Sequence, residues 1–145
     1  MTAKDLYDHD FLEWTRCNAA LLRAGRFGEA DILHIAEEIE DMGKRERREM
    51  LGRLAVLLTH LLKYEFQPDR RSSSWIETIG AQRIDLDLLL ADNPSLKVGL
   101  QAAVDRMYPI AVRQAARETA LARGTFPVSC PYSVHEILDG DFFPK

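Results

Sequence analysis

Several polar side chains that could serve a binding or catalytic site interrupt the apolar faces of the predicted helices. On a helix predicted from residue 29 to 66, a projection at 100° per residue places Glu46 within an apolar face and His60 at its edge. A buried carboxylate beside a histidine is suited to general acid–base chemistry. The candidate pocket residues are Glu46, Arg53, His60, Tyr64, Gln82, Arg83 and Glu118. We expect such a pocket to lie between helices, where helical bundles commonly hold ligands.

A purely structural interpretation of the same residues is the one we favour. An unpaired charge in a core costs several kcal/mol, so an inward Glu46 needs a partner whatever its purpose. Arg53 or Arg83 could pair with it, and His60 could donate a hydrogen bond to a backbone carbonyl. The sequence also lacks recognisable hydrolase and phosphate-binding motifs. We therefore assign no catalytic residue and favour a chain that is not an enzyme.

Metal-binding patterns are weak. Di-iron bundles use Glu-x-x-His on two helices, and no histidine of this chain has a glutamate three positions before it. Asp31 and His34, and likewise His34 and Glu37, offer possible ligands one turn apart. The projection, however, turns His34, Glu37, Glu38 and Asp41 away from the apolar face, toward solvent. Cys17 and Cys130 lack the spacing of a zinc site. We expect neither a metal nor a cofactor.

Charge is segregated along the middle of the chain. Residues 37–41 contain four acidic side chains, whereas residues 44–48 contain four basic ones. Together with Arg70 and Arg71, the basic stretch suggests nucleic-acid binding as one alternative. Acidic residues interleave with it, however, and the net charge of the chain is −4. We therefore favour internal salt bridges and expect no nucleic-acid partner.

The fold class predicted from apolar spacing is all-α, because no alternation is long enough to indicate a strand. With 46% hydrophobic and 29% charged residues, the composition is that of a globular protein. We predict one domain, residues 1–145, built as a bundle of four main helices with an extended C-terminal tail and a short terminal helix. The predicted helices span about residues 8–24, 29–66, 74–91, 94–123 and 133–139.

Gly43 raises the question of whether the second predicted helix is continuous, because glycine costs about 1 kcal/mol in a helix interior. Opposite charges alternate every four residues across it, at Asp41, Arg45, Glu49 and Arg53. Such a ladder forms only on an unbroken helix. We therefore predict one long helix that bends near Gly43 and ends near Phe66, before Pro68.

Capping signals predict the remaining boundaries. Ser74 and Glu77 form a potential capping box. Asn93 could cap the last long helix, with Pro94 in its first turn. That helix should kink before Pro109 and close at Gly124.

The C-terminal segment combines a second capping signal with two aromatic residues. Ser133 and Glu136 predict a short helix by the same capping-box rule. The adjacent Phe142 and Phe143 predict that the tail packs back on the body of the protein.

The chain resembles the bacterial family known as domain of unknown function twenty-nine. The resemblance rests on segments that span most of the sequence: Tyr7, Asp10, Phe11, Trp14, Glu37–Gly43, Leu57–Lys63, Gln67–Pro68, Arg71, Trp75, Phe126–Pro127, Cys130–Tyr132 and Asp141–Phe142. It implies a small, stand-alone, all-helical bacterial protein with no established activity, cofactor or catalytic residue. Arg45 departs from the family pattern, where a small polar residue tends to follow the glycine and its basic neighbour, and this favours a continuous helix here.

The expected function is that of a small cytoplasmic protein-interaction module, which presents its charged helix and tail to a protein partner. The N-terminal residues do not form a secretory signal, and the longest apolar stretch, residues 54–62, is too short to span a membrane. An enzyme or small-ligand binder that uses the polar pocket is the first alternative, and nucleic-acid binding is the second. The residues do not determine the partner or the oligomeric state.

Overall fold

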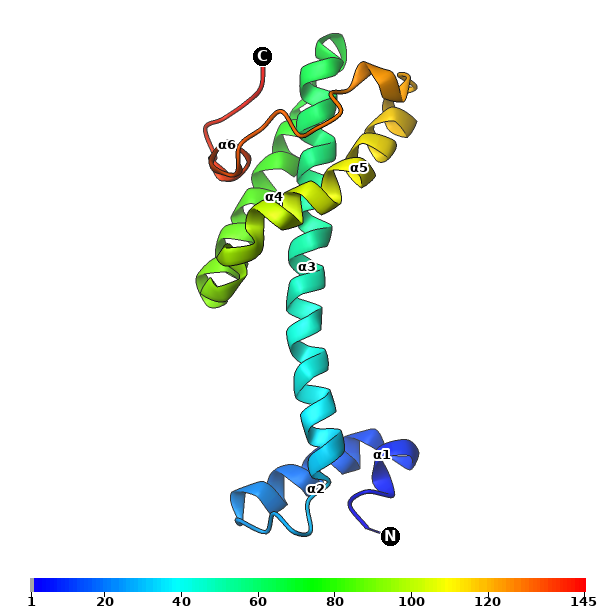
Figure 1. The fold of residues 1–145 in the computed structure, drawn as a ribbon, viewed down its shortest axis with the longest axis vertical. Helices are drawn as coiled ribbons and strands as arrows, with labels where there is room; N and C mark the ends of the chain where they lie inside the picture. The colour runs from blue at the N-terminus through cyan, green and yellow to red at the C-terminus, as the bar shows by residue number, and fades with distance from the viewer. Residues whose placement is uncertain (1) are drawn as a thin grey trace. The chain divides into compact units, whose positions relative to one another are not determined.

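The computed structural model describes residues 2–145, and these residues form helices without any strand (Figure 1). Four of the helices are long, as the sequence predicts. The α-helices are α1 (Leu6–His9), α2 (Phe11–Arg23), α3 (Ile32–Phe66), α4 (Ser73–Asp92), α5 (Leu100–Thr119) and α6 (Val134–Leu138). Short 3-10 helices are η1 (Pro68–Arg70), η2 (Pro94–Gly99) and η3 (Arg123–Thr125).

Contacts within the chain divide it into two compact units. The N-terminal unit ends at Arg45, and the C-terminal unit runs from Glu46 to Lys145. Helix α3 contributes to both, since it is helical without interruption from Ile32 to Phe66. The predicted continuity through Gly43 is therefore confirmed. The predicted bend at that residue and the predicted single domain stay predictions.

The first predicted helix, residues 8–24, is divided at Asp10. The backbone of Asp10 leaves the helical region, with φ −154° and ψ 87°. Its carboxylate accepts a hydrogen bond of 3.0 Å from the Glu13 N–H, which caps the start of α2. Beyond α2, Gly25 adopts a positive φ of 72°, a conformation that glycine reaches without steric cost.

The start of α4 lies earlier than the capping pattern predicts. Ser72 has extended backbone angles, and its hydroxyl accepts a hydrogen bond from the Trp75 N–H at 3.3 Å. The predicted capping box of Ser74 and Glu77 is therefore wrong, because Ser74 already lies in the first turn. Two serines two positions apart offer the same local signal, and the chain path out of η1 selects the first.

Helix α5 is shorter than predicted at both ends. The segment that follows Asn93 is the 3-10 helix η2, and the Asn93 amide donates to the Leu89 carbonyl at 3.0 Å instead of capping α5. At the other end α5 stops at Thr119, where Ala120 enters the left-handed region with φ 60°. Gly124 therefore does not end this helix. Pro109 lies inside α5, which continues through it, and the kink stays a prediction.

The core of the C-terminal unit joins α3, α4, α5 and the tail. Its fully buried side chains are Leu54, Leu57, Leu58, Leu61 and Leu62 of α3, Ile79 and Leu86 of α4, Ala111 and Ala115 of α5, and Ile137 of α6. Full burial of one such leucine or isoleucine contributes about 1.5–3 kcal/mol. The small alanines of α5 leave room for the larger leucines of α3.

The C-terminal tail packs on this core, as the sequence predicts. Phe142 and Phe143 are partly buried against it, and the Tyr132 hydroxyl donates to the Leu61 carbonyl at 3.2 Å. The capping box of Ser133 and Glu136 is confirmed, with both reciprocal hydrogen bonds present at the start of α6.

The left-handed conformation of Ala120 generates a stability prediction. Ala120→Gly should raise the free energy of unfolding by about 0.5–1 kcal/mol, because glycine adopts a positive φ without a clash of its Cβ. Ala122, which is also exposed but has φ −66°, provides the matched control. Ala122→Gly should lower stability in the same urea titration. An equal response of the two variants would contradict the backbone argument.

Candidate functional site

The predicted acid–base pair of Glu46 and His60 is not assembled. The two residues are fourteen positions apart in the unbroken helix α3, so a rise of 1.5 Å per residue separates them by about 21 Å. Glu46 is partly exposed and has no hydrogen bond or ion pair with any side chain among residues 2–145. The angular projection places both residues correctly on one side of the helix but ignores this axial distance.

Arg53 links α3 to α4 through partners other than Glu46. Its guanidinium contacts Glu49 at 3.0 Å and Asp85 at 2.8 Å, with a longer contact of 3.4 Å to the Gln82 amide oxygen. The expected pairing of Glu46 with Arg53 is therefore wrong. Of the predicted charge ladder, only the pair of Glu49 and Arg53 is formed as an ion pair among the described residues.

Arg83 is buried and holds α6 in place. Its Nε donates to the Ile137 carbonyl at 2.8 Å and its Nη2 to the Glu136 carbonyl at 3.1 Å. Burial lowers the pKa of Arg83, and nearby Asp139 and Asp87 partly offset that effect. The guanidinium thus binds backbone carbonyls of the tail, and it does not pair with Glu46.

His60 and Glu118 do come together, at a shallow cavity of about 300 Å³ that Gln114 also lines. His60 Nδ1 lies 2.8 Å from the Val56 carbonyl, so this nitrogen carries the proton and the expected carbonyl bond is confirmed. Burial lowers the pKa of His60. Glu118 accepts a bond of 3.4 Å from Lys63, so both polar groups are already engaged.

Tyr64 packs against Arg71 and against the C-terminal end of the chain. The Arg71 guanidinium lies 4.1 Å from the centre of its ring, and Phe143 packs against it at 5.2 Å. Arg71 also donates to the carbonyls of Tyr64 and Lys145, at 2.7 and 3.0 Å. This arginine of the predicted basic surface is thus committed to internal contacts.

The sequence predicts that the basic side chains near the middle of α3 form internal salt bridges, and for most of them this prediction is wrong. Lys44, Arg45, Arg47 and Arg48 are exposed, and none has an ion-pair partner among residues 2–145. Their charges remain available to a ligand or to another protein.

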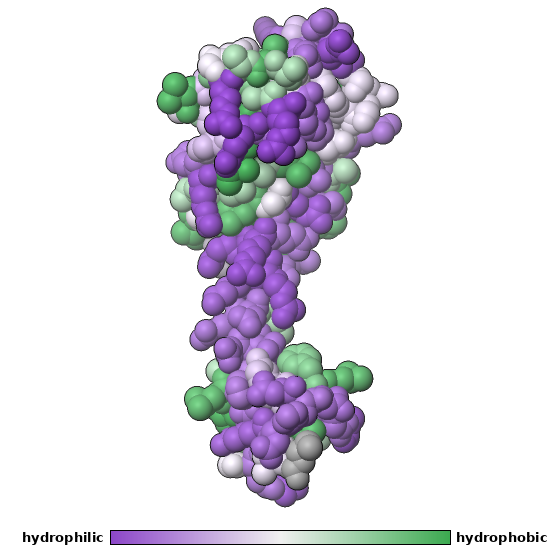
Figure 2. All heavy atoms as spheres, turned by 90° about the vertical axis from the view of Figure 1, so that its right-hand side faces the viewer, coloured by the Kyte–Doolittle hydropathy of each residue, from purple (hydrophilic) through white to green (hydrophobic). Residues whose placement is uncertain are grey.

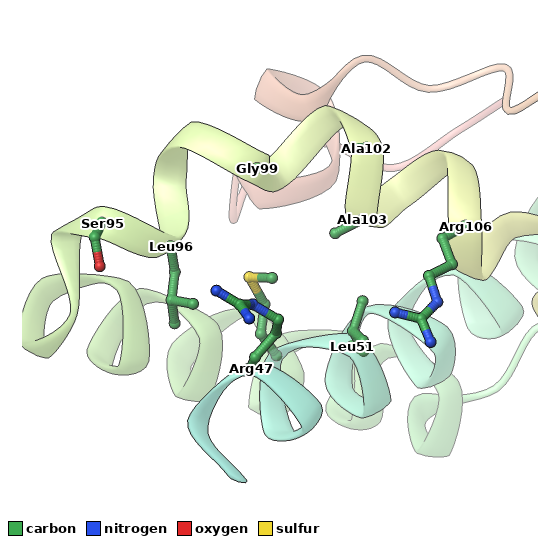
Figure 3. Close-up of a pocket in the computed structure, with 9 residues that line it drawn as sticks. Arg47, Leu51, Ser95, Leu96, Gly99, Ala102, Ala103 and Arg106 are labelled. Atoms are coloured by element: carbon green, nitrogen blue, oxygen red, sulfur yellow. The ribbon is translucent and has the colours of Figure 1, made fainter. Parts of the chain in front are cut away.

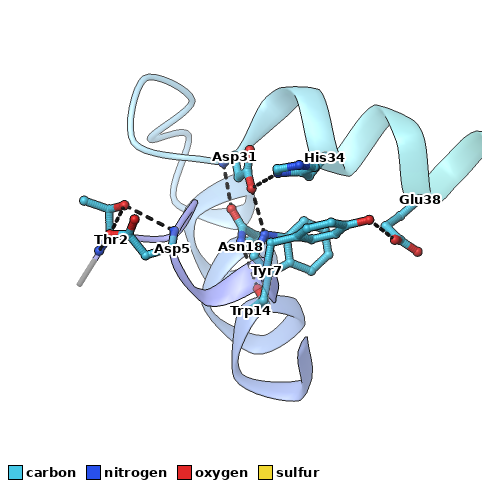
Figure 4. A network of polar contacts seen from close by, with 8 residues as sticks. All are labelled: Thr2, Asp5, Tyr7, Trp14, Asn18, Asp31, His34 and Glu38. Carbon is cyan, nitrogen blue, oxygen red and sulfur yellow. Dashed lines mark hydrogen bonds and ion pairs between the residues drawn. The ribbon is translucent and has the colours of Figure 1, made fainter. Parts of the chain in front are cut away.

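Sequence reasoning missed a polar network in the N-terminal unit, centred on Asp31 (Figure 4). Asp31 is 2% exposed, and its carboxylate accepts bonds from Trp14 Nε1 at 3.0 Å and His34 Nδ1 at 2.7 Å. Its backbone N–H donates to the Asn18 side chain at 2.8 Å. Burial alone would raise the pKa of Asp31, but the bonds from His34 and Trp14 outweigh it and hold the pKa below the usual value of 3.8.

Tyr7 covers the outer side of this network. Its ring stacks on His34 with centroids 3.8 Å apart and an angle of 8° between the planes. Its hydroxyl donates to Glu38 at 2.6 Å, which raises the pKa of Tyr7 to about 12. The predicted solvent-facing His34 and Glu38 are therefore partly buried contact residues of α3.

Two sequence signals pointed toward this network without identifying it. Asn18 interrupts the apolar face of the first predicted helix, and Asp31 immediately precedes α3. The contact of Trp14 with Asp31 joins residues seventeen positions apart across a loop, so periodicity alone cannot predict it. A carboxylate that orients a histidine can also support catalysis, but here the His34 ring lies flat against Tyr7, as in a structural clamp.

An apolar groove of about 330 Å³ lies between α2 and α3, directly on the hydrogen-bonded cluster of Trp14, Asn18, Asp31 and His34, which we call the clamp. Trp14 and Asn18 contribute its buried floor. Apolar walls come from Phe11, Leu22, Ile35, Ile39 and Met42, and the charged Glu38 and Arg45 also line the groove. Figure 2 shows apolar residues at the surface of the N-terminal unit, in agreement with exposures of 49% for Phe11, 60% for Ile39 and 53% for Met42.

A second cavity, of about 300 Å³, lies in the C-terminal unit between α3 and the segment formed by η2 and α5 (Figure 3). Met50, Leu51, Leu96 and Ala103 provide apolar walls. Arg47 reaches into it from α3 and Arg106 from α5, on either side of Leu51. Neither guanidinium has a hydrogen-bond or ion-pair partner within residues 2–145.

Metal-binding clusters and membrane-spanning helices are both absent from the described part of the chain. No group of three or more His, Cys, Asp and Glu side chains within residues 2–145 could hold a metal ion. Over the same residues, no helix has both the length and the apolar character to cross a lipid bilayer.

Comparison with known proteins gives one match. The model of a family described as "Domain of unknown function DUF29" matches residues 6–143, which is nearly the whole chain. No curated protein and no solved structure matches the sequence. The geometry of the chain's own residues must therefore carry any functional argument.

The Asp31 network generates a prediction about stability and pH. Asp31→Asn should lower the free energy of unfolding at pH 7 by about 1–3 kcal/mol, because the amide replaces a charged acceptor of two hydrogen bonds. Since the folded-state pKa is depressed, this stabilisation is present above the unfolded value near 3.8 and is lost as the pH falls through the folded pKa. Urea titrations at several pH values would measure it, with the Trp14 indole N–H resonance as a local probe.

The matched control for this experiment is Asp69→Asn, at an exposed position in η1. It should leave both the unfolding free energy and the Trp14 resonance unchanged. A loss of stability equal to that of Asp31→Asn, or a wild-type stability for Asp31→Asn at pH 7, would contradict the assigned role.

Proposed function

This chain belongs to the DUF29 family, whose description names no activity, and we propose that it functions as a protein-interaction module. The proposed contact surface is the groove between α2 and α3 of the N-terminal unit, which would receive an apolar helical face of its partner. The observation that carries the proposal is a groove of exposed apolar side chains whose floor, Trp14 and Asn18, is held in place by hydrogen bonds.

The distribution of exposed apolar residues supports the proposal. Among residues 2–145, fifteen large hydrophobic residues are exposed. Eight of these lie within residues 2–45: Phe11, Leu12, Leu22, Phe27, Ile32, Leu33, Ile39 and Met42. Isolated exposed hydrophobic residues are normal, but a contiguous set that lines a groove is typical of an interaction surface. Fully burying one side chain such as Ile39 gains about 1.5–3 kcal/mol.

The floor of the groove is held in a fixed position before any partner binds. Asp31 fixes the Trp14 indole, and the Asn18 amide donates to the Trp14 carbonyl at 2.9 Å while its oxygen accepts from the Asp31 N–H. A surface that is already ordered loses less conformational entropy on association. The clamp therefore favours binding without contacting the partner itself.

The proposal locates the contact surface on the groove rather than on the C-terminal tail. The tail is engaged in its own unit, where Phe142 and Phe143 pack against the core and Arg71 binds the Lys145 carbonyl. Releasing these contacts would cost free energy before the tail could bind another protein.

A cytoplasmic location is part of the same proposal. Cys17 and Cys130 are both free thiols, and unpaired cysteines suit a reducing compartment. Burial raises the pKa of Cys130, which makes that thiol less reactive.

The interaction can be tested by photo-cross-linking in the cells that produce the protein. With p-benzoylphenylalanine in place of Ile39, irradiation should give a defined product with another polypeptide. Adding Met42→Asp to the same chain should lower its yield about tenfold or more, because burying an unpaired charge in an apolar contact costs several kcal/mol and about 1.4 kcal/mol already corresponds to a tenfold change.

The matched control places the same cross-linker at Glu77, an exposed position of α4 in the C-terminal unit. That position should give no defined product. Absence of a product from position 39, or a product that Met42→Asp leaves unchanged, would count against the interaction module.

A second candidate function, binding of a small anion with an apolar part, is supported by the cavity of Arg47 and Arg106. Neither arginine has an acidic residue three or four positions away on its own helix, whereas Arg53 has Glu49. Two guanidiniums without carboxylate partners above apolar walls suit an amphipathic carboxylate or phosphate.

Isothermal titration with octanoate would test this candidate. The intact chain should bind octanoate but not octylamine, which has the same apolar part and the opposite charge. The double variant Arg47→Gln/Arg106→Gln should weaken binding about tenfold or more, since a charge-assisted hydrogen bond contributes about 1.5–3 kcal/mol. Arg48→Gln, at an exposed position outside the cavity, is the control, and equal loss in both variants would refute the site.

A further inference from the structure

We infer that the occupant of the groove is a second copy of this chain, which packs its own α3 antiparallel against the first across a two-fold axis. This inference rests on the proposed function, because it uses the same groove and names the partner. It follows from the order of apolar and charged side chains along α3.

The apolar part of the surface is a stripe of three residues on α3. Ile35, Ile39 and Met42 occupy positions i, i+4 and i+7, so they lie on one side of the helix. All three line the groove, and more than half of the surface of Ile39 and Met42 is exposed. A stripe with this spacing packs well against a like stripe of another helix.

Two opposite charges border this stripe along the same side. Glu38 and Arg45 are seven positions apart, which is two helical turns, so both lie on the same edge of the stripe. Glu38 accepts a bond from Tyr7, which leaves its other carboxylate oxygen open, and Arg45 has no ion-pair partner within residues 2–145. The N-terminal unit therefore presents one acid and one base that are too far apart to pair with each other.

The order of these charges decides the orientation of the two copies. In a parallel pair the two-fold axis runs along the helices, so the edge that carries Glu38 and Arg45 would lie on opposite sides of the two copies and neither charge would meet its opposite. In an antiparallel pair with the axis between Asp41 and Met42, Glu38 of each copy faces Arg45 of the other. The same arrangement interleaves Ile39 and Met42 across the axis. The surface is thus self-complementary, as a two-fold contact requires.

The two kinds of contact have different roles. Burial of the apolar stripe supplies the affinity, and Phe11 and Leu22 extend the apolar surface on the α2 side of the groove. The ion pairs at the edge are partly hydrated, so they mainly select orientation and register. This division makes charge substitutions the sharpest test of the pairing.

The first experiment is analytical ultracentrifugation of the full-length chain and of charge variants. The wild-type chain should form a dimer that dissociates on dilution. Glu38→Arg and Arg45→Glu should each weaken it about 10- to 100-fold, because either change makes both symmetric edge contacts repulsive. An equimolar mixture of the two variants should dimerise again. The Glu38→Arg chain carries arginine at both positions 38 and 45, and the Arg45→Glu chain carries glutamate at both. Each edge contact of the mixed dimer therefore joins one arginine to one glutamate.

The control variant is Glu40→Arg, which changes charge by the same amount on another side of α3 and should leave dimerisation unchanged. A wild-type chain that stays monomeric at all concentrations would overturn the inference. So would a mixture of Glu38→Arg and Arg45→Glu that shows no recovery while circular dichroism shows both variants folded.

A second experiment does not depend on the folding of Glu38→Arg, which loses the bond from Tyr7. In a chain with Cys17→Ser and Cys130→Ser, Met42→Cys places a thiol next to the two-fold axis and should form an intermolecular disulfide on oxidation. Ile35→Cys should not, because its symmetry mate is about 20 Å away along the helix axis. Equal cross-linking at both positions would indicate a parallel pair and overturn the antiparallel arrangement.

Failure of this inference can be distinguished from failure of the proposed function. If the purified chain is monomeric but the cross-linker at Ile39 still captures a different protein in cells in a manner that Met42→Asp abolishes, the groove binds a heterologous partner. If the purified chain is monomeric and the cross-linker at position 39 also captures no polypeptide in cells, both the second copy and the interaction module are refuted.

Discussion

The unbroken hydrogen bonding of α3 is the constraint on which the arrangement of the polar residues depends. A helix fixes both the direction and the height of each side chain, so residues on one face can still be too far apart to cooperate. Glu46 and His60 share a side of α3 but meet different neighbours. Arg53 reaches Asp85 of α4, and Lys63 reaches Glu118 of α5. The helix thus distributes its polar groups among several local contacts and assembles no single polar pocket.

The Asp31 carboxylate has a comparable role within the N-terminal unit. A buried charge is tolerated only when hydrogen bonds replace its hydration, and Trp14 and His34 supply them here. The same bonds orient the Trp14 ring. The Asn18 side chain connects the Trp14 carbonyl to the backbone N–H of Asp31, which immediately precedes α3. A polar clamp beneath an apolar groove therefore gives the groove a defined shape. Stability and the proposed binding are therefore linked in this unit, because one carboxylate would serve both.

The availability of Arg47 and Arg106 on the surface follows from their local sequence. An arginine with an acidic residue one turn away, such as Arg53 with Glu49, is largely neutralised on its own helix. Arg47 and Arg106 lack such neighbours, and the fold brings them to one cavity. Arg45 borders the groove of the other unit and forms no ion pair within residues 2–145, although Asp41 and Glu49 lie one turn away on the same helix. Both proposed surfaces therefore arise where the chain leaves a guanidinium without an intramolecular partner.

The sequence by itself determined the all-α class, the approximate positions of the long helices, the continuity of α3 and the return of the tail to the core. These features depend on apolar periodicity and on capping contacts within a few residues, as at Ser133 and Glu136. Where two local signals compete, as between Ser72 and Ser74, only the path of the chain selects one. The tertiary structure alone decided which polar groups pair, including the buried contact of Trp14 with Asp31. Periodicity gives the face on which a side chain lies, but a hydrogen bond requires proximity in all three dimensions.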